Sequence, residues 1–122
     1  MSVSTIKRSQ KESLLFRSIS ELFRETTLED KNLASLMVSR VKLSDDKGVC
    51  IIFFYTSGGL EEFKQKLKIL LLYKGSLRRA LAQSIASRYT PELVFKFDDQ
   101  YEKQQRIENL LEQVKGEDSS TD

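Results

Sequence analysis

The chain contains the run Val49-Cys50-Ile51-Ile52-Phe53-Phe54-Tyr55, in which every side chain is apolar. β-branched and aromatic residues of this kind are typical of strands. A strand with one face in water would alternate apolar and polar side chains, whereas a continuously apolar run is typical of a strand that is buried on both faces. We therefore predict a central strand over residues 49–55, with other elements packed around it.

The residues before this strand predict a hairpin partner and an amphipathic helix. A strand is predicted from about Ala34 to Ser44, where β-branched residues are frequent. Asp45-Asp46-Lys47-Gly48 then supplies acidic turn residues and a glycine that can adopt a positive φ, so a β-hairpin closes there. Further upstream, Thr5 to Thr27 places apolar residues at helical spacing, which predicts the first helix.

The residues after the central strand predict two helices with a kink between them. Apolar residues from Leu60 to Leu71 recur at helical spacing, and a third helical stripe runs from Leu77 to about Arg88. Gly75 and Ser76 interrupt these two stripes. Because glycine lowers helix stability, we expect the chain to change direction at this point.

Pro91 marks the start of a last strand, because proline has no N–H to donate and is tolerated at the first residue of a strand. This strand covers Glu92–Phe97, where the apolar side chains alternate. Asp98 or Asp99 then caps a short C-terminal helix, and the small, polar residues 116–122 form an acidic disordered tail. The chain thus predicts one α+β domain over residues 1–115, a two-layer sandwich of helices on one face of a three-stranded sheet.

The composition limits the possible functions. The 122 residues correspond to one domain, and a hydrophobic fraction of 39% with a charged fraction of 31% is typical of a soluble globular protein. There is no histidine, which is the commonest general base and transition-metal ligand. Cys50, the single cysteine, is predicted to be a buried core thiol. Because neither a membrane helix nor a signal peptide is recognisable, we expect a cytoplasmic location and no membrane partner.

Basic residues are concentrated in one part of the chain. Between Phe63 and Pro91 there are seven basic residues and no acidic one, whereas Glu92 to Asp122 holds nine acids and four bases. Exposed helical faces usually mix both signs through i, i+4 pairs. The acid-free segment therefore favours RNA or DNA as the partner, since cations bind the phosphates of nucleic acids. The alternative is that these cations only solvate the outer faces of helices.

Two segments of the chain resemble the ribosome-binding factor A family. They are Gly75-Ser76-Leu77-Arg78-Arg79-Ala80-Leu81-Ala82 and Ser87-Arg88-Tyr89-Thr90-Pro91-Glu92-Leu93-Val94-Phe95, of which Arg88 to Phe95 is the most specific part. Further matches are Ser44-Asp45-Asp46, Arg106-Ile107 and Leu110-Leu111, so the resemblance covers about residues 6–114. The chain departs from the family pattern at Tyr73, where alanine is usual, and at Lys31, where proline is usual.

The resemblance implies a KH-like fold of the type II order, in which a helix, two strands, a helix, a kink, a helix and a strand follow one another. It also implies a non-catalytic RNA-binding assembly factor without a cofactor. Such a factor associates with free or immature 30S subunits and promotes late maturation and processing of 16S rRNA near its 5′ end. A monomer is expected, with an assembly GTPase as a further candidate partner.

The expected RNA-binding residues combine the basic segment with the kink at Tyr73-Lys74-Gly75. Lys64 and Lys68 lie one helical turn apart, as do Lys74 and Arg78, so each pair can contact successive phosphates. Cations near the N-terminus extend this surface. The full set is Lys7, Arg8, Lys11, Lys64, Lys68, Lys74, Gly75, Ser76, Arg78, Arg79 and Arg88.

Two other functions remain open from the sequence. The apolar segment Ile69 to Tyr73 is the candidate docking site of a KH-like protein-interaction module without direct rRNA contact. A small enzyme is disfavoured, because the chain lacks histidine and a recognisable nucleophile arrangement. A metal site at Asp45-Asp46 or Asp98-Asp99 is not expected either, since turns and helix caps favour aspartate. Gly58-Gly59 lacks the following Gly-Lys-Ser/Thr of a phosphate-binding loop.

Overall fold

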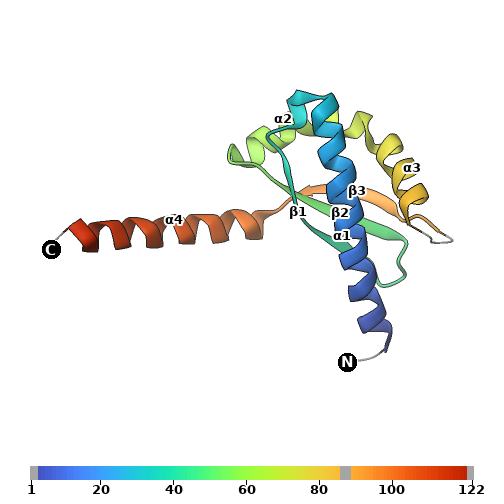
Figure 1. The fold of residues 1–122 in the computed structure, drawn as a ribbon, viewed down its shortest axis with the longest axis horizontal. Coiled ribbons are helices and arrows are strands. Elements are labelled where there is room, and N and C mark those ends of the chain that lie inside the picture. The colour runs from blue at the N-terminus through green and yellow to red at the C-terminus, as the bar shows by residue number, and fades with distance from the viewer. Residues whose placement is uncertain (1–2, 86–88, 121–122) are drawn as a thin grey trace.

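Four α-helices and a three-stranded sheet make up the computed structural model, which describes residues 3–85 and 89–120, with side chains over 7–85 and 89–115. The elements occur in the predicted order, and α1, α2 and α3 pack on the sheet in two layers (Figure 1), so the α+β fold is confirmed. They are α1 (Val3–Glu29), the short 3-10 helix η1 (Lys31–Leu33), β1 (Met37–Leu43), β2 (Val49–Tyr55), α2 (Gly59–Leu72), α3 (Lys74–Ser84), β3 (Glu92–Phe97) and α4 (Asp99–Ser120).

β2 is the central strand, as predicted, and lies between antiparallel β1 and parallel β3. The parallel pair requires a long crossover, which α2 and α3 supply. On the inward face of β2, Cys50, Ile52 and Phe54 are at most 1% exposed. On the outward face, Ile51 and Phe53 are only half-buried. The prediction that neither face of this strand meets water is therefore wrong for the outward face, because the covering helices lie on the other side.

The core lies between the inward face of the sheet and helices α1, α2 and α3. The ring centroid of Phe54 lies 5.1 Å from that of Phe23 on α1, 5.6 Å from Phe95 on β3 and 6.1 Å from Phe63 on α2. Each helix also contributes a fully buried leucine, namely Leu15, Leu70 and Leu81. Burying a side chain of this size contributes about 1.5–3 kcal/mol. The helical stripes recognised in the sequence therefore hold the helices on the sheet.

The turn between β1 and β2 confirms the predicted hairpin but not the residue with positive φ. Lys47 has a φ of 61°, whereas Gly48 is not in the left-handed region. The Asp46 carboxylate accepts hydrogen bonds from the Gly48 N–H at 2.9 Å and from the Ser44 hydroxyl at 2.7 Å. These bonds hold a turn in which the left-handed residue is Lys47, one residue before the predicted Gly48. A glycine does adopt positive φ at Gly59, where φ is 75° at the start of α2.

Two internal boundaries also differ from the predictions. β1 begins at Met37 rather than near residue 34, because η1 and the turn after it precede the strand. The break between α2 and α3 falls at Tyr73, so Gly75 and Ser76 lie in the first turn of α3 and do not interrupt the helices. Glycine lowers helix stability by only about 0.5–1 kcal/mol, which the packing of Leu77 and Leu81 from α3 outweighs.

The last helix, α4, projects away from the two-layer domain (Figure 1). It runs past Gly116 to Ser120, so it is longer than predicted and the predicted domain boundary at residue 115 is not a helix end. Asp98 caps it, because its carboxylate accepts a hydrogen bond from the Tyr101 N–H at 3.1 Å. Leu110 and Leu111 on its surface are 61% and 60% exposed. None of the described helices is long and apolar enough to cross a membrane.

Candidate nucleic-acid interface

Tyr73 is the single residue between α2 and α3, and the kink forms there. Helical hydrogen bonding continues through Tyr73. The Tyr73 N–H donates to the Leu70 carbonyl at 3.0 Å, and the Tyr73 carbonyl accepts from the Leu77 N–H at 2.8 Å. The phenol hydroxyl donates to Asp30 Oδ2 at 2.8 Å, and Asp30 also caps η1 by accepting from the Asn32 N–H at 3.0 Å. The kink is thereby tied to the chain that follows α1.

The hydrogen bond between Tyr73 and Asp30 changes the acidity of both groups. The phenol, followed by the Asn32 N–H, lowers the pKa of Asp30, so this carboxyl group stays ionised well below neutral pH. The same hydrogen bond, followed by burial, raises the pKa of Tyr73, so the phenol keeps its proton. Each group therefore stays in the protonation state that the bond requires. The contact at the kink is insensitive to pH near neutrality.

A groove of about 510 Å³ opens beside the kink, between α3 and the chain that leads into β3. Arg79 is exposed there, and Tyr89 is 73% exposed. A Cβ atom added to Gly75 would meet no heavy atom within 4 Å, so space is open above the helix at that residue. A guanidinium, an exposed aromatic ring and accessible backbone can bind phosphates and stack on bases. The lining of this kink groove is Gly75, Arg78, Arg79, Ala82, Tyr89 and Thr90.

On α3, the predicted RNA-binding cations Lys74 and Arg78 make contacts within the protein. Arg78 donates to the carbonyl oxygens of Pro91 at 3.1 Å and of Thr90 at 2.9 Å. Lys74 Nζ lies 3.2 Å from Glu92 Oε1. Both contacts tie α3 to the start of β3. Of the adjacent arginines that α3 carries, Arg78 therefore has a structural contact, while Arg79 is directed to solvent.

The predicted cations of α2 do not line the kink groove. Lys64 and Lys68 are both exposed and lie one turn apart, as predicted. At about 1.5 Å of rise per residue, they lie about 13 Å and 7 Å along the helix from Tyr73. Ser76 is exposed in the first turn of α3. Arg88 lies outside the described residues.

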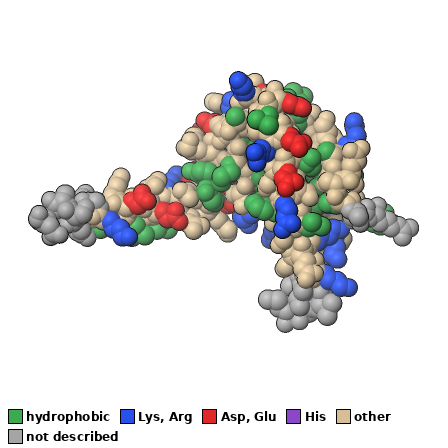
Figure 2. Space-filling model, viewed as in Figure 1, with side chains coloured by type: hydrophobic (Ala, Val, Ile, Leu, Met, Phe, Trp, Pro, Cys, Tyr) green, Lys and Arg blue, Asp and Glu red, His purple; other side chains and the backbone are tan. Residues whose placement is uncertain are grey.

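The basic residues of α1 form a separate site at the opposite end of α3. A groove of about 400 Å³ there is lined by Lys7, Gln10, Lys11, Leu14, Leu15, Lys47 and Ile85. Ile85 directly follows the last turn of α3, whereas the kink groove begins at its first turn. Arg8 instead forms an ion pair with Asp45 in the β1–β2 turn. Figure 2 shows Lys and Arg side chains along the rim beside α3 and along the N-terminal part of α1.

Among the residues that line these grooves, an aromatic residue, Tyr89, and a cation, Lys47, do not belong to the predicted set. Tyr89 lies within the segment that resembles the family, and an aromatic residue between Arg88 and Thr90-Pro91 is a signal for base stacking. Lys47 has no such signal, because two acidic neighbours balance its charge in the sequence. It is brought to Lys7 and Lys11 only by the packing of the hairpin beside α1.

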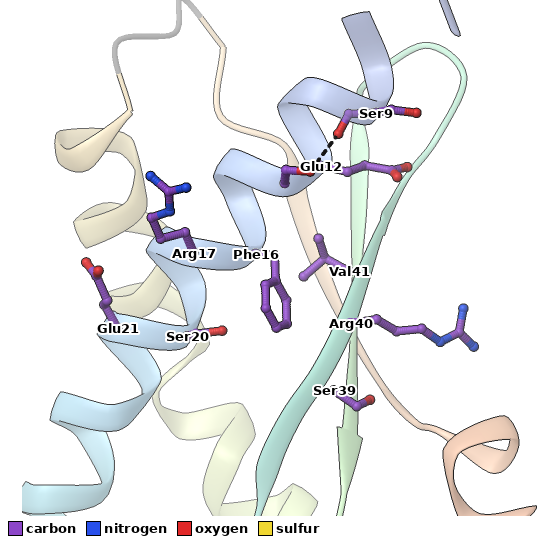
Figure 3. A pocket seen from close by; sticks show the side chains of 10 residues that line it. Ser9, Glu12, Phe16, Arg17, Ser20, Glu21, Ser39, Arg40 and Val41 are labelled. Carbon is purple, nitrogen blue, oxygen red and sulfur yellow. Dashed lines mark hydrogen bonds between the residues drawn. The ribbon is translucent and has the colours of Figure 1, made fainter. Parts of the chain in front are cut away.

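A larger groove, of about 660 Å³, lies between α1 and β1 (Figure 3). Phe16 and Val41 line it together with groups of both signs, among them Glu12, Glu21 and Arg17. The mixed charge gives a polyanion no net attraction. The candidate interface is therefore the kink groove, although it is the smaller of the two.

Comparison with known proteins finds relatives over most of the chain. The family model described as ribosome-binding factor A matches residues 7–111. The ribosome-binding factor A of Geotalea daltonii is 32% identical over an alignment of 111 residues, which covers 88% of this chain and 88% of that chain. The crystal structure of ribosome-binding factor A from Thermus thermophilus has a TM-score of 0.62 and 29% identity, and covers 73% of this chain and 93% of that chain. A homology model of the T. thermophilus protein, fitted into a cryo-EM map of a 30S complex, has a TM-score of 0.55 and 31% identity over 70% of this chain and 88% of that one.

Proposed function

Because this chain belongs to the ribosome-binding factor A family, we propose that it is a non-catalytic, RNA-binding assembly factor of the small ribosomal subunit. It associates with free or immature 30S subunits and promotes late maturation and processing of 16S rRNA near its 5′ end. It acts as a monomer without a cofactor, and an assembly GTPase is a candidate for a cooperating partner. The 30S complex of the T. thermophilus relative supports the choice of the small subunit as the binding partner.

The kink groove is the observation that carries this proposal. It combines the exposed Arg79 and Tyr89 with open space above Gly75, so a phosphate, a base and a close backbone approach can be accommodated within a few residues. The segment from Phe63 to Pro91 contributes no acidic side chain that would repel the rRNA. Binding is therefore expected to be electrostatic in large part.

Co-sedimentation with purified 30S subunits over a series of salt concentrations tests the proposal. Wild-type protein should bind at low salt and dissociate steeply as salt rises, and Arg79→Gln should bind more weakly, with the slope of log K against log salt reduced by about 0.7–0.9. Lys115→Gln, on the exposed part of α4, is the matched control and should bind like wild type. Binding only to complete ribosomes, no binding at low salt, or an unchanged Arg79→Gln variant would each contradict the proposal.

A second candidate function is supported by the exposed apolar end of α2. Leu71 is 50% exposed and Leu72 is 80% exposed beside the kink, so a protein partner can dock there without direct rRNA contact. In that case Leu72→Ser should abolish 30S association while Arg79→Gln leaves it unchanged. These two positions separate the functions better than Lys74 or Arg78, whose replacement would also break contacts within the domain.

A further inference from the structure

The outward face of the sheet lies on the side away from α1, α2 and α3. Because side chains alternate along a strand, the residues between the buried Cys50, Ile52 and Phe54 point to this side. Ile51, Phe53 and their neighbour Val94 on β3 are half-buried there. The helices that contact the strands extensively are α1, α2 and α3, so an apolar strip in the middle of this face remains accessible.

Strand register surrounds that strip with three cations. Arg40 is paired with Phe53 and Phe53 with Lys96, so these three residues form one row across the sheet. Lys42 is paired with Ile51 in the next row. Strands lie about 4.8 Å apart and rise about 3.3 Å per residue, so the Cα atom of Arg40 lies about 10 Å from that of Lys96 and about 7 Å from that of Lys42. Lys42 and Lys96 are exposed.

The Arg40 guanidinium lies over the ring of Phe53. The Cζ atom of Arg40 lies 3.8 Å from the ring centroid. Its Nε donates to Asp98 Oδ2 at 2.9 Å, and its Nη2 donates to Asp98 Oδ1 at 3.4 Å. The Arg40 side chain is nevertheless 40% exposed, and Figure 3 shows it pointing away from α1. The guanidinium is thus fixed over Phe53, and its exposed part can contact a further flat group, since arginine stacks on planar rings.

We propose that this outward face is a second RNA-binding surface, which takes single-stranded RNA with one base stacked on Arg40 and phosphates beside Lys42 and Lys96. The charge of the face is complementary to RNA, because Asp98 is 2% exposed and engaged by Arg40, while Glu92, at the edge of the face, is paired with Lys74. A fixed planar guanidinium between cations favours a stacked base over an acidic peptide. The inference rests on the proposed function in its choice of RNA, but it uses a different surface from the kink groove.

Fluorescence anisotropy with a labelled oligouridylate tests the surface directly. The double variant Lys42→Gln/Lys96→Gln replaces exposed side chains only and should fold normally. It is expected to lose two phosphate contacts, so the drop in affinity between about 50 and about 200 mM salt should shrink about sevenfold relative to wild type. Arg40→Lys keeps the charge but loses the flat group, and it should bind about tenfold more weakly. Lys115→Gln on α4 is the matched control and should bind like wild type.

Wild-type affinity and salt dependence in Lys42→Gln/Lys96→Gln would overturn the inference. Binding of polyglutamate in place of oligouridylate would also overturn it, since the face would then serve an acidic protein. The 30S co-sedimentation of Arg79→Gln tests the proposed function independently, so failure of this inference can be distinguished from failure of the proposed function. If Arg79→Gln weakens 30S binding and Lys42→Gln/Lys96→Gln does not change oligouridylate binding, the kink groove is retained as the RNA site and the sheet is rejected as a second one. If the double variant binds oligouridylate weakly and the wild type does not bind 30S subunits, the ribosomal function is rejected, while the sheet remains the proposed RNA-binding surface.

Discussion

Replacing Asp98 by asparagine tests the polar contact that joins β1 to the start of α4. Asp98 is 2% exposed, and its carboxylate accepts from the Ser39 hydroxyl at 2.7 Å, from Arg40 Nε at 2.9 Å and from the Tyr101 N–H at 3.1 Å. Burial by itself would raise the pKa of Asp98, but the hydrogen bonds from Arg40, Ser39 and Tyr101 together outweigh it and hold the pKa below its ordinary value. Asparagine keeps the size of the side chain and removes its charge.

The expected loss of stability follows from these contacts. A hydrogen bond to a charged group contributes about 1.5–3 kcal/mol, against about 0.5–1.5 kcal/mol for a neutral one. Each carboxylate oxygen accepts two hydrogen bonds, and asparagine offers one acceptor oxygen instead of two, so two of the present hydrogen bonds lose their acceptor. Arg40 is 40% exposed, and water compensates part of its loss. We expect the free energy of unfolding to fall by about 2 kcal/mol at neutral pH, which corresponds to a decrease in Tm of about 8 °C.

Urea unfolding of the wild type and Asp98→Asn at a series of pH values is the assay. A carboxyl group whose pKa is lower in the folded state stabilises the fold above its unfolded pKa of about 4, and this contribution is lost as pH falls through the folded pKa. The difference between the two proteins should therefore be largest near neutral pH and shrink below about pH 4. The other carboxyl groups with lowered pKa values, Asp30, Asp46 and Glu62, are present in both proteins and cancel in the difference.

Asp99→Asn is the matched control, because Asp99 is exposed next to Asp98, and it should change the stability little at any pH. Equal stability of Asp98→Asn and wild type at neutral pH would refute the assignment of a stabilising contact to this carboxylate. A difference that stays constant down to strongly acidic pH would refute the role of its charge.

The remaining predictions concern the core, the kink and the thiol. Phe54→Ala should lower the free energy of unfolding in urea by about 4 kcal/mol, because its ring lies at the centre of the core; a loss below about 1 kcal/mol would contradict this packing. Gly75→Ala should stabilise the fold by about 0.5–1 kcal/mol, since its Cβ meets open space, while weakening 30S co-sedimentation; unchanged binding would mean that the ligand does not approach this backbone. Tyr73→Phe should keep the circular dichroism spectrum of the wild type and weaken 30S binding, because the kink loses its hydrogen bond to the chain after α1; wild-type binding would show that this bond is dispensable. Burial and then the charge of Glu12 raise the pKa of the Cys50 thiol to about 11, so a thiol reagent should modify it only after unfolding, and equal rates in buffer and in urea would contradict its burial.

Local patterns in the sequence were sufficient for the order of the elements. The bounds of the central strand at Val49 and Tyr55 agree with the structure, because a run of β-branched and aromatic residues is itself the physical cause of a strand. The helical stripes are similarly direct, since the residues that recur at helical spacing are those that the core buries. Boundaries that depend on single turns were less accurate. The helices meet at Tyr73, the first residue of the expected kink Tyr73-Lys74-Gly75, and Gly75 lies inside α3. No local pattern reveals that the Tyr73 phenol has a partner in Asp30.

The site was only partly predictable. The sequence indicated a basic region around α3, and it contained Arg79 and Gly75, which line the kink groove. It did not distinguish Arg79 from Arg78, because the contacts of Arg78 to Thr90 and Pro91 form only when α3 packs beside the chain entering β3. Nor does the sequence separate the cations of α1 from those at the kink, because the position of a charge along the chain does not show which groove it lines.

The sequence by itself determined the α+β fold, the central strand, the acid-free segment and the family, since all of these depend on residue type and on spacing along the chain. Only the tertiary structure decided which cations are exposed and which are engaged. It also brought Arg40 onto Phe53 and Asp98, a residue 58 positions further along the chain, and aligned Lys42 and Lys96 on the same face. Such contacts depend on strand register and on packing between distant segments, and a local pattern of residues does not specify either of them.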